Sequence, residues 1–430
     1  MLSTGAKDAE ERLIARVGLD VPVDQLFDYW AGEATSADIG SRVIAPFGRR
    51  LEVGLLLELR HGSNLDSQRI KPVNTVLRDG TALPPDCLQL LSFVSAYYHH
   101  PLGQVMMGAL PQLLRRTRAI PEQESCYAAT SAGREKDPAS LGPRHGVARR
   151  LLGALQHASH LTRHEIAAIS PRAGAALKRL IEAGWVNKAP LPPHRQELST
   201  SASPVLTREQ ADAVREVTEA LTRFRVFLLH GVTGSGKTEV YLRLAEQTLQ
   251  RGGQMLVLVP EINLTPQLVG AFRNRFPAAR IACLHSAMGE GERFTEWRRA
   301  KNGEAAILIG TRLAVFAPLP KLALIVVDEE HDSSFKQQDG LRYSARDVAV
   351  MRAKQVACPI VLGSATPSLE SYVNATNGRY RLLNLVHRPI ARAPPAISFI
   401  DLRQETCTEG LSKSLLDRLN RGLQRGEQSL

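Results

Sequence analysis

The stretch 231–238 reads GVTGSGKT, a complete match to the pattern G-x-x-x-x-G-K-[S/T] of nucleotide-binding loops. Phosphate groups need several backbone N–H groups that converge on one point, and glycines let the chain turn that closely without side-chain clashes. An apolar run, 226–229, precedes the loop, and residues 239–250 follow it with helical spacing. The phosphates would therefore lie at a helix N-terminus, where the backbone favours negative charge. The pattern predicts a site for a nucleoside triphosphate.

The loop residues have separate expected roles. Lys237 would reach the β- and γ-phosphates of ATP, and the hydroxyl of Thr238 would bind Mg²⁺. A chance glycine turn is the alternative, and the strand before the loop and the helix after it argue against that alternative. The residues predicted to contact ATP are Gly231, Val232, Thr233, Gly234, Ser235, Gly236, Lys237 and Thr238.

A second motif, Asp328-Glu-Glu-His331, follows the aliphatic run 324–327. In P-loop folds a strand that ends in an acid presents a carboxylate to Mg²⁺, and Asp328 has that position. Glu329 is placed to polarise an attacking water as a general base. A solvated acidic loop after a core strand is the alternative, which the phosphate loop upstream disfavours. We therefore predict that Lys237, Asp328 and Glu329 are the catalytic residues.

Residues 363–367 read GSATP and follow the apolar run 359–362. Small hydroxyl residues in such a place can connect a γ-phosphate site to a DNA path through hydrogen bonds. The string is weak by itself, but after the GVTGSGKT and DEEH motifs it resembles the third motif of superfamily 2 helicases. The coupling residues that this series implies are His331, Ser364 and Thr366.

The same resemblance implies roles for residues outside these motifs. Gln210 lies upstream of the phosphate loop, where superfamily 2 helicases recognise adenine. The strings 259–267 and 310–312 fall where these motors hold the backbone of a nucleic-acid strand, and hydroxyl and guanidinium groups suit such phosphate contacts. The residues predicted to make those contacts are Thr265, Thr311 and Arg312.

Composition sets the broad class of the protein. The 430 residues are 43% hydrophobic, which is typical of a soluble globular protein. The five cysteines form no C-x-x-C pair, and the N-terminus is too polar for a signal sequence, so we expect a cytoplasmic protein that does not associate with a membrane. The net charge of +11 suits a polyanionic partner such as nucleic acid.

Proline-, glycine- and serine-rich stretches predict linkers at 119–145 and 189–205. They separate a β-rich N-terminal domain, 1–118, a middle domain, 146–188, and a C-terminal part, 206–430. In the last part apolar runs alternate with longer amphipathic stretches, which predicts an α/β fold with a parallel sheet. Three short helical stretches and a strand in the basic middle domain resemble a winged-helix DNA-binding domain; a helical spacer is the alternative.

Further strings make the resemblance narrower, and they extend over nearly the whole chain. They are LFDY at 26–29, VIAPFG at 43–48, YYHHP at 97–101 and GSATPSLE at 363–370. With the motifs above, the chain resembles the primosomal replication-restart helicases, a family within superfamily 2. The resemblance implies a RecA-like motor lobe, an ATP-dependent 3′→5′ DNA helicase activity, recognition of stalled or abandoned replication forks, and initiation of primosome assembly. It also implies branched DNA (forks and D-loops), primosome loading proteins and single-stranded DNA-binding protein as partners.

That family has an N-terminal domain that captures the 3′ end of a nascent strand. In such a pocket an aromatic ring would stack on a base, and a carboxylate would accept a hydrogen bond from the 3′-hydroxyl. Core packing is the alternative role for the aromatic ring. The pocket residues that map by motif are Phe27, Asp28, Gly40 and Lys71, the last supported only by the pair Ile70-Lys71.

The loop after the acidic motif resembles an aromatic-rich loop of the family, with one departure. This chain has Leu341 where the family usually has tryptophan. A leucine cannot stack on a base as an indole does, so DNA sensing by the loop would depend on Phe335 and Tyr343. The loop residues predicted to contact DNA are Phe335, Lys336, Arg342 and Tyr343.

The chain ends at Leu430, where this family would enter a second motor lobe that carries an arginine finger and a cysteine-rich zinc-binding insertion. We therefore expect no zinc ligands, and we expect this chain alone to bind ATP and forks but to hydrolyse ATP slowly and unwind little. Two alternative functions remain open. One is another superfamily 2 DNA translocase, and the other is a fork-binding platform that uses ATP as a switch.

Overall fold

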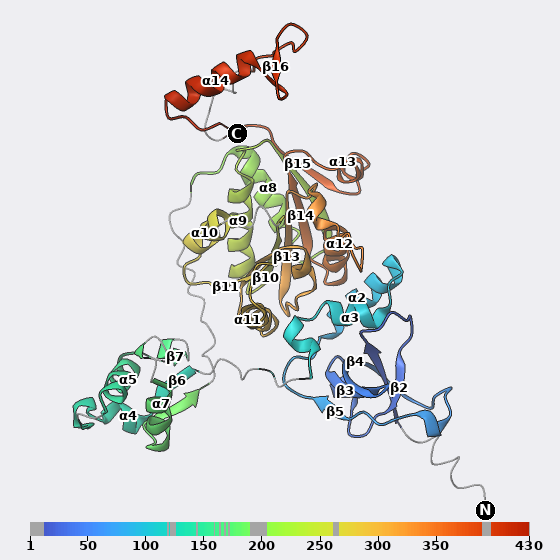
Figure 1. Cartoon of the computed structure of the whole chain (residues 1–430), viewed down its shortest axis with the longest axis vertical. Coiled ribbons are helices and arrows are strands. Elements are labelled where there is room, and N and C mark those ends of the chain that lie inside the picture. Colours follow the sequence, from blue (N-terminus) through green and yellow to red (C-terminus); the bar gives the residue numbers. More distant parts are fainter. Residues whose placement is uncertain are drawn as a thin grey trace, which may run out of the picture. The chain divides into compact units, whose positions relative to one another are not determined.

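The structure is a computed structural model that describes residues 13–117, 120, 126–142, 145–158, 160–162, 165–166, 169–170, 173–189, 204–260, 266–388 and 397–429. The chain divides into two compact units, Met1–His387 and Arg388–Leu430, and each is described by itself. Figure 1 labels their helices and strands. Within the described ranges, every helix is too short or too polar to cross a membrane.

A seven-stranded sheet dominates the larger unit, with the strand order β11-β12-β10-β13-β14-β9-β15. All of its neighbouring strands are parallel, which confirms the predicted α/β fold (Figure 1). The strands are buried apolar runs, as a parallel sheet covered on both faces requires. They are β9 (Arg225–Gly231), β10 (Gln254–Leu258), β11 (Ile281–Leu284), β12 (Ile307–Gly310), β13 (Leu322–Asp328), β14 (Pro359–Ser364) and β15 (Arg381–Leu385).

Alternate residues of these strands contribute to two different cores. Leu228, Leu256 and Leu258 cluster with residues of α11 and α12, whereas Phe227 and Leu229 cluster with residues of α8 and α9. Because successive side chains of a strand point to opposite faces, the two clusters cover opposite faces of the sheet. The helices of this region are α8 (Arg208–Thr218), α9 (Lys237–Gln250), α10 (Pro266–Arg275), α11 (Glu290–Lys301), η7 (Arg312–Phe316), η8 (Ser333–Phe335), α12 (Ala345–Gln355) and α13 (Leu369–Thr376).

The N-terminal residues form an antiparallel sheet with the strand order β2-β1-β4-β3-β5. The two edges of this sheet meet, because the Trp30 N–H donates to the Lys71 carbonyl at 2.9 Å and the Trp30 carbonyl accepts from the Val73 N–H at 3.0 Å. These bonds close the sheet into a small barrel and protect its edges. The elements are β1 (Leu13–Leu19), β2 (Phe27–Trp30), η1 (Ser36–Asp38), β3 (Arg42–Phe47), β4 (Arg50–His61), η2 (Ser67–Arg69) and β5 (Thr75–Leu77).

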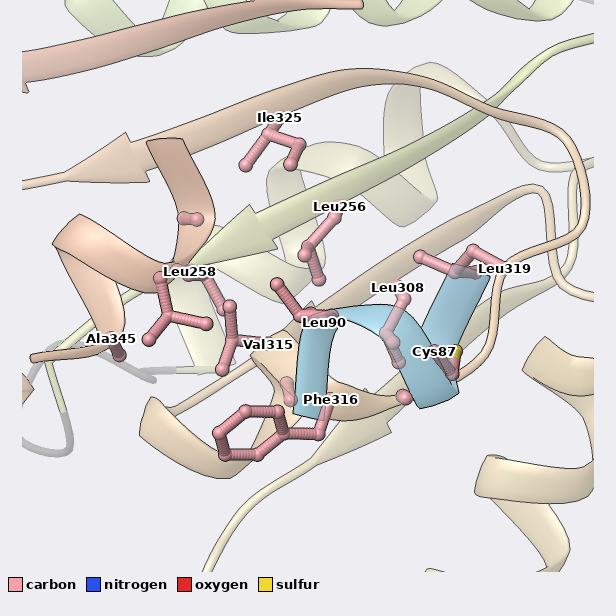
Figure 2. Close-up of a cluster of buried hydrophobic side chains, with 14 of the residues drawn as sticks. Cys87, Leu90, Leu256, Leu258, Leu308, Val315, Phe316, Leu319, Ile325 and Ala345 are labelled. Atoms are coloured by element: carbon pink, nitrogen blue, oxygen red, sulfur yellow. The ribbon is translucent and has the colours of Figure 1, made fainter. Parts of the chain in front are cut away.

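Two helices, α2 (Pro85–Tyr98) and α3 (Leu102–Gly108), and the short helix η3 (Gln112–Arg115) follow the barrel. Figure 2 shows Cys87 and Leu90 of α2 among side chains of the parallel sheet and its connections. The same hydrophobic cluster includes residues of β4 in the barrel. The N-terminal domain and the parallel sheet therefore share one continuous core.

The middle residues form a small domain with its own hydrophobic cluster. The prediction of a linker over 119–145 is wrong in part, because β6 (Cys126–Ala129) pairs antiparallel with β7 (Leu161–Thr162) and β8 (Val186–Ala189). A four-residue strand has no detectable period, and its partners lie far along the sequence. The winged-helix assignment stays a prediction. The helices are α4 (Ser131–Glu135), η4 (Pro138–Ser140), α5 (Gly146–His157) and α7 (Ala173–Glu182).

The second unit, Arg388–Leu430, lies inside the range predicted for the motor lobe, 206–430. The structure separates it from the parallel sheet, whose last strand in the chain is β15. Its elements are the antiparallel pair β16 (Cys407–Thr408) and β17 (Leu411–Ser412), and α14 (Lys413–Gln424). The compact unit that contains the motor sheet therefore ends at His387, before the end of the range predicted for the motor lobe.

Candidate nucleotide and DNA site

The phosphate loop connects the end of β9 to the start of α9, as predicted. Gly234 and Gly236 have φ angles of +79° and +85°, a conformation that L side chains rarely adopt. A Cβ atom at Gly231 would lie 2.5 Å from the Ser235 Oγ, so this position also needs glycine. The helix begins without a side-chain cap, which leaves its first N–H groups to a phosphate.

Lys237 lies across the loop and is mostly buried. Its Nζ donates to the Gly231 carbonyl at 3.2 Å and lies 3.6 Å from the Glu329 Oε1. Thr238 is half-buried in the first turn of α9. The ammonium group and Glu329 thus face each other, as a phosphate-binding lysine beside a general base would. The exposed loop residues are Val232, Thr233 and Gly234.

Asp328 ends β13 and accepts a hydrogen bond from the Tyr241 hydroxyl at 2.9 Å. Burial raises the pKa of Asp328, whereas the hydrogen bond from Tyr241 lowers it. Tyr241 lies one turn beyond Lys237 on α9, and a Cβ atom at Gly363 would lie 1.8 Å from its hydroxyl oxygen. Sequence reasoning missed Tyr241, because its proximity to Asp328 and Gly363 exists only in the folded structure.

His331 joins the acidic motif to the GSATP string. Its Nδ1 lies 2.8 Å from the Ser364 Oγ and 3.6 Å from the Glu329 Oε2, and its Nε2 lies 3.4 Å from the Thr366 Oγ1. Glu329 has a φ angle of +47°, which is unusual for a residue with a side chain. The structure therefore brings the three predicted coupling residues together beside the predicted base.

Glu330 was not predicted as a site residue, yet it is the most buried acid of the motif. It accepts hydrogen bonds from the Ser368 N–H at 2.7 Å and the Ser371 hydroxyl at 2.8 Å, and it pairs with Arg346 at 3.1 Å. Ser368 caps α13. Glu330 therefore fixes the acidic motif to the start of α13, which is a positioning role.

Gln210 is 3% exposed and uses its amide within the protein. Its Nε2 donates to the Ser235 carbonyl at 2.8 Å, and its Oε1 accepts from the Thr207 N–H at 3.0 Å. It thereby connects the start of α8 to the phosphate loop. Adenine recognition by Gln210 stays a prediction, and in this structure the side chain supports the loop.

The aromatic residues of the loop after the acidic motif are in the core. Phe335 is 3% exposed and Tyr343 is 1% exposed, and the ring of Tyr343 lies 5.0 Å from that of Phe316. Neither ring presents a face to solvent in this structure, and a contact of these two rings with DNA bases stays a prediction. Lys336 and Arg342 are exposed and remain the predicted DNA contacts of this loop.

The residues predicted to hold a strand backbone lie after β12. Thr311 is 6% exposed, and Arg312 is half-buried and donates to the Ser334 carbonyl at 3.0 Å. Arg312 thus connects this segment to the loop that follows the acidic motif. Thr265 lies outside the described residues.

The predicted 3′-end residues occupy different parts of the barrel. The half-buried ring of Phe27 packs edge-on against Phe47 at 5.2 Å. Gly40 is buried with a φ angle of +85°, and a Cβ atom there would lie 2.2 Å from the Leu83 carbonyl oxygen, so its role in this structure is conformational. Lys71 is exposed beside β2.

Asp28 is held by several donors. Its side chain is 7% exposed and lies 3.4 Å from the Arg16 Nε and 2.9 Å from the Arg60 Nη2. The Ser63 hydroxyl also donates to it at 2.5 Å. The carboxylate therefore already has hydrogen-bond partners, and a 3′-hydroxyl would have to join or replace them.

Comparison with known proteins agrees with this geometry. The family model of the PriA 3′ DNA-binding domain matches residues 16–111, and that of the DEAD/DEAH box helicases matches residues 207–375. The replication restart protein PriA of Haemophilus influenzae is 35% identical over 429 residues, which are 97% of this chain and 58% of that protein. This chain belongs to the PriA family.

Another member of the PriA family matches a shorter stretch at higher identity. The replication restart protein PriA of Bacillus subtilis is 42% identical over 266 residues, which are 60% of this chain and 33% of that protein. This chain thus spans little more than half the length of its relative from Haemophilus influenzae. A solved structure of RecG bound to a three-way DNA junction overlaps 51% of this chain and 26% of that chain, with 20% identity and a TM-score of 0.33.

The donors at the phosphate loop of this PriA-family chain fit a magnesium nucleotide. The Thr238 hydroxyl and the Asp328 carboxylate are the oxygen ligands that Mg²⁺ prefers. The buried Ser235 Oγ has no hydrogen-bond partner among the described residues, and Lys237 supplies a positive charge. Elsewhere, the described residues hold no group of three or more His, Cys, Asp or Glu suited to a metal ion.

Proposed function

We propose that this chain carries the fork-recognising and ATP-binding parts of a replication restart helicase. The whole protein would recognise stalled or abandoned forks in the cytoplasm, move 3′→5′ with ATP, and start primosome assembly. The supporting observation is a 3′ DNA-binding barrel that shares one core with a helicase P-loop sheet. Forks and D-loops would be its DNA ligands, and loading proteins and single-stranded DNA-binding protein its partners.

The ATP site would depend on a small number of side chains. Lys237 binds the β- and γ-phosphates, and Glu329 accepts a proton from the attacking water. Mg²⁺, which Thr238 and Asp328 would hold, supplies positive charge at the phosphates when it is bound. Lys237 and Glu329 are 3.6 Å apart, so the γ-phosphate would enter between groups that already face each other.

The coupling to DNA would pass through His331. Its Nδ1 lies near both the Glu329 carboxylate and the Ser364 hydroxyl, and its Nε2 lies near the Thr366 hydroxyl. A change in the charge or position of Glu329 during hydrolysis would therefore reach the GSATP string through one imidazole ring. A second connection runs through Glu330, which joins the acidic motif to the start of α13.

The experiment that tests this function compares fork binding at one salt concentration. The forks have a leading arm that ends at the junction in a 3′-hydroxyl or in a 3′-phosphate, and binding is measured by fluorescence anisotropy. We expect about tenfold tighter binding to the hydroxyl fork, the free energy of one hydrogen bond to a charged group. Asp28→Asn should remove that preference and keep the shape of the side chain.

Glu58→Gln is the matched control, because Glu58 also pairs with Arg16 at 3.0 Å but is 47% exposed. This variant should keep the preference for the hydroxyl fork, and thermal melting should show both variants folded. Equal binding of the wild-type chain to both forks would contradict 3′-end recognition. It would leave a DNA motor without end specificity.

A further inference from the structure

A cavity of about 400 Å³ lies between the end of the N-terminal domain and the parallel sheet. We call it the seam cavity. One wall is the segment 108–115, which includes η3, and the other is made by the end of β11, by α11 and by η7 with the residues beside it. The shared core of α2 and the sheet fixes these two walls relative to each other (Figure 2). The volume is within the range of cavities that enclose small ligands.

The lining of the seam cavity is positively charged. Three arginines line it, together with a histidine, and the lining contains no aspartate or glutamate. None of the three forms an ion pair with another described residue. Unpaired guanidinium groups in a partly buried site favour an anion. The arginines are Arg115, Arg293 and Arg312.

Backbone carbonyls orient two of these arginines. The Arg115 Nη2 donates to the Gly108 carbonyl at 2.6 Å, and the Arg293 Nη2 donates to the Ser286 carbonyl at 2.9 Å. These bonds use part of each guanidinium and leave its other N–H groups for a ligand. Burial lowers the pKa of Arg115, Asp20 opposes this, and the charge of Arg293 lowers it further, so the two cations are close enough to repel. A phosphate between them would relieve that repulsion.

A buried donor without a partner among the described residues belongs to the lining of the cavity. Trp297 is 2% exposed and lines the cavity, and its Nε1–H has no hydrogen-bond partner among the described residues. Leaving such a donor unpaired in a buried place is unfavourable, and an acceptor on a ligand would remove that penalty. The remaining lining is largely apolar, with residues such as Leu284 and Ala317. An inorganic ion would fill only the charged end, whereas a nucleotide offers a phosphate and an apolar ring with acceptors.

We infer that the seam cavity binds one nucleotide of a DNA single strand, with the phosphate at Arg115 and Arg293 and the base near Trp297. Thr311 and Arg312, predicted to contact a strand backbone, line the same cavity. The inference rests on the proposed function, because the strand on the motor lobe is the source of the nucleotide. A nucleotide held here would contact the N-terminal domain and the motor lobe at once.

The first test measures binding of a single-stranded oligonucleotide by anisotropy at several salt concentrations. We expect Arg115→Gln and Arg293→Gln each to weaken binding about fivefold and to lower the salt slope by about 0.7, the loss of one phosphate contact on a single strand. Arg115→Lys should restore the salt slope, which a purely structural role would not do. Melting temperatures check that each variant is folded.

Arg116→Gln is the matched control. Arg116 follows Arg115 but is already paired with Glu290 at 2.7 Å across the seam, and it does not line the cavity. This variant should keep the affinity and the salt slope of the wild-type chain. Similar losses in Arg115→Gln and Arg116→Gln would overturn the inference, because they would reflect general charge.

The second test follows tryptophan fluorescence, since the chain has only three tryptophans, Trp30, Trp185 and Trp297. The oligonucleotide should quench the emission of the wild-type chain, and Trp297→Phe should remove most of that quenching. Trp30→Phe and Trp185→Phe are the controls and should keep it. Quenching that persists in Trp297→Phe would overturn the inference.

Free thymidine monophosphate distinguishes the source of the nucleotide. We expect the monophosphate to quench the emission little at concentrations where the oligonucleotide saturates. Equal quenching by the two would contradict the inference that the ligand is a DNA strand. A wild-type chain that binds neither single strands nor forks would contradict the proposed function instead. Normal fork binding with unchanged cavity variants would contradict only the seam cavity.

Discussion

The predicted nucleotide site around Lys237 and Glu329, which we call the nucleotide edge of the parallel sheet, differs from the Asp28 site of the barrel. The difference lies in how far their charged and polar groups already have partners within the protein. At the nucleotide edge, Lys237 and Glu329 are 3.6 Å apart, and the Ser235 Oγ has no partner among the described residues. In the barrel, Asp28 already contacts two arginines and a serine. The first site keeps polar groups for a ligand, whereas the second must exchange existing contacts for new ones. Changes at the first should alter binding alone, and changes in the barrel should also alter stability.

The largest expected effect separates ATP binding from DNA binding. Lys237→Ala removes the ammonium group that lies 3.6 Å from the Glu329 carboxylate. We expect ATP binding to fall by roughly a hundredfold or more, the loss of a mostly buried charge contact. Fork binding should stay within about twofold, because the substitution removes a single charge from a chain of +11. Calorimetry with ATP and anisotropy with forks measure the two effects, and equal losses of both would contradict the separation.

The buried ring of Tyr343 provides the next effect, which should appear in stability and leave specificity unchanged. Tyr343→Ala removes a side chain that is 1% exposed, and we expect it to lower the free energy of unfolding by about 3–5 kcal/mol. Tyr343→Phe keeps the ring and should cost less, because only the hydroxyl, which interacts with Arg312, is lost. Denaturant unfolding measures both. If Tyr343→Phe weakened DNA binding without changing stability, the ring would have a role in contacting DNA after all.

Gly40 tests whether the barrel position is a ligand contact or a backbone requirement. Gly40→Ala adds a Cβ atom 2.2 Å from the Leu83 carbonyl oxygen at a φ angle of +85°, so we expect a loss of roughly 2 kcal/mol in stability. Gly48→Ala is the control, since Gly48 has a φ angle of +60° but nothing within 4 Å of an added Cβ atom. It should cost less, because only the backbone strain remains. Equal costs would show that the close contact at Gly40 relaxes without strain.

The nucleotide edge was predictable because its chemistry depends on spacing along one chain. The motif consists of glycines at fixed offsets, a lysine at a helix start and an acid at a strand end. A parallel P-loop sheet brings these groups to the same edge. Tyr241 was not predictable in this way, because a tyrosine on an amphipathic helix is usually a core residue. Only the fold shows that its hydroxyl reaches Asp328 at 2.9 Å.

The aromatic loop and the middle domain show why core packing and the pairing of distant strands could not be predicted from the sequence. An aromatic ring can pack in a core or stack on a base, and the sequence does not distinguish these two roles. In the structure the ring of Tyr343 packs against Phe316 in the core. The strand β6 is defined by its pairing with β8, about 60 residues away, and not by any local pattern. The closure of the barrel through Trp30 and Lys71 is likewise a contact between distant segments. The roles of the site residues themselves stay predictions.

The smallest expected effect concerns the pH dependence of ATP hydrolysis. Burial raises the pKa of Asp328 and the Tyr241 hydroxyl opposes that rise, so Tyr241→Phe should raise the pKa of Asp328 further. Because Asp328 must be ionised to act at the ATP site, the acid limb of the rate profile should move to higher pH. The basic limb should stay unchanged. The lost hydrogen bond is one to a carboxylate, and its loss should move the acid limb without lowering the maximal rate, so the effect near neutral pH should be small.

The pH profile of the hydrolysis rate measures this displacement, and the wild-type chain and Tyr241→Phe are compared at saturating ATP. Arg243→Gln is the control on the same helix, because Arg243 pairs with Glu239 at 3.1 Å and has no contact with Asp328. A lower rate at every pH, with no movement of the acid limb, would mean that Tyr241 acts through packing against Gly363. If the acid limb moves in Tyr241→Phe and not in the control, the Tyr241 hydroxyl is a positioning group for Asp328. The nucleotide edge would then depend on an internal hydrogen bond, as the Asp28 site does.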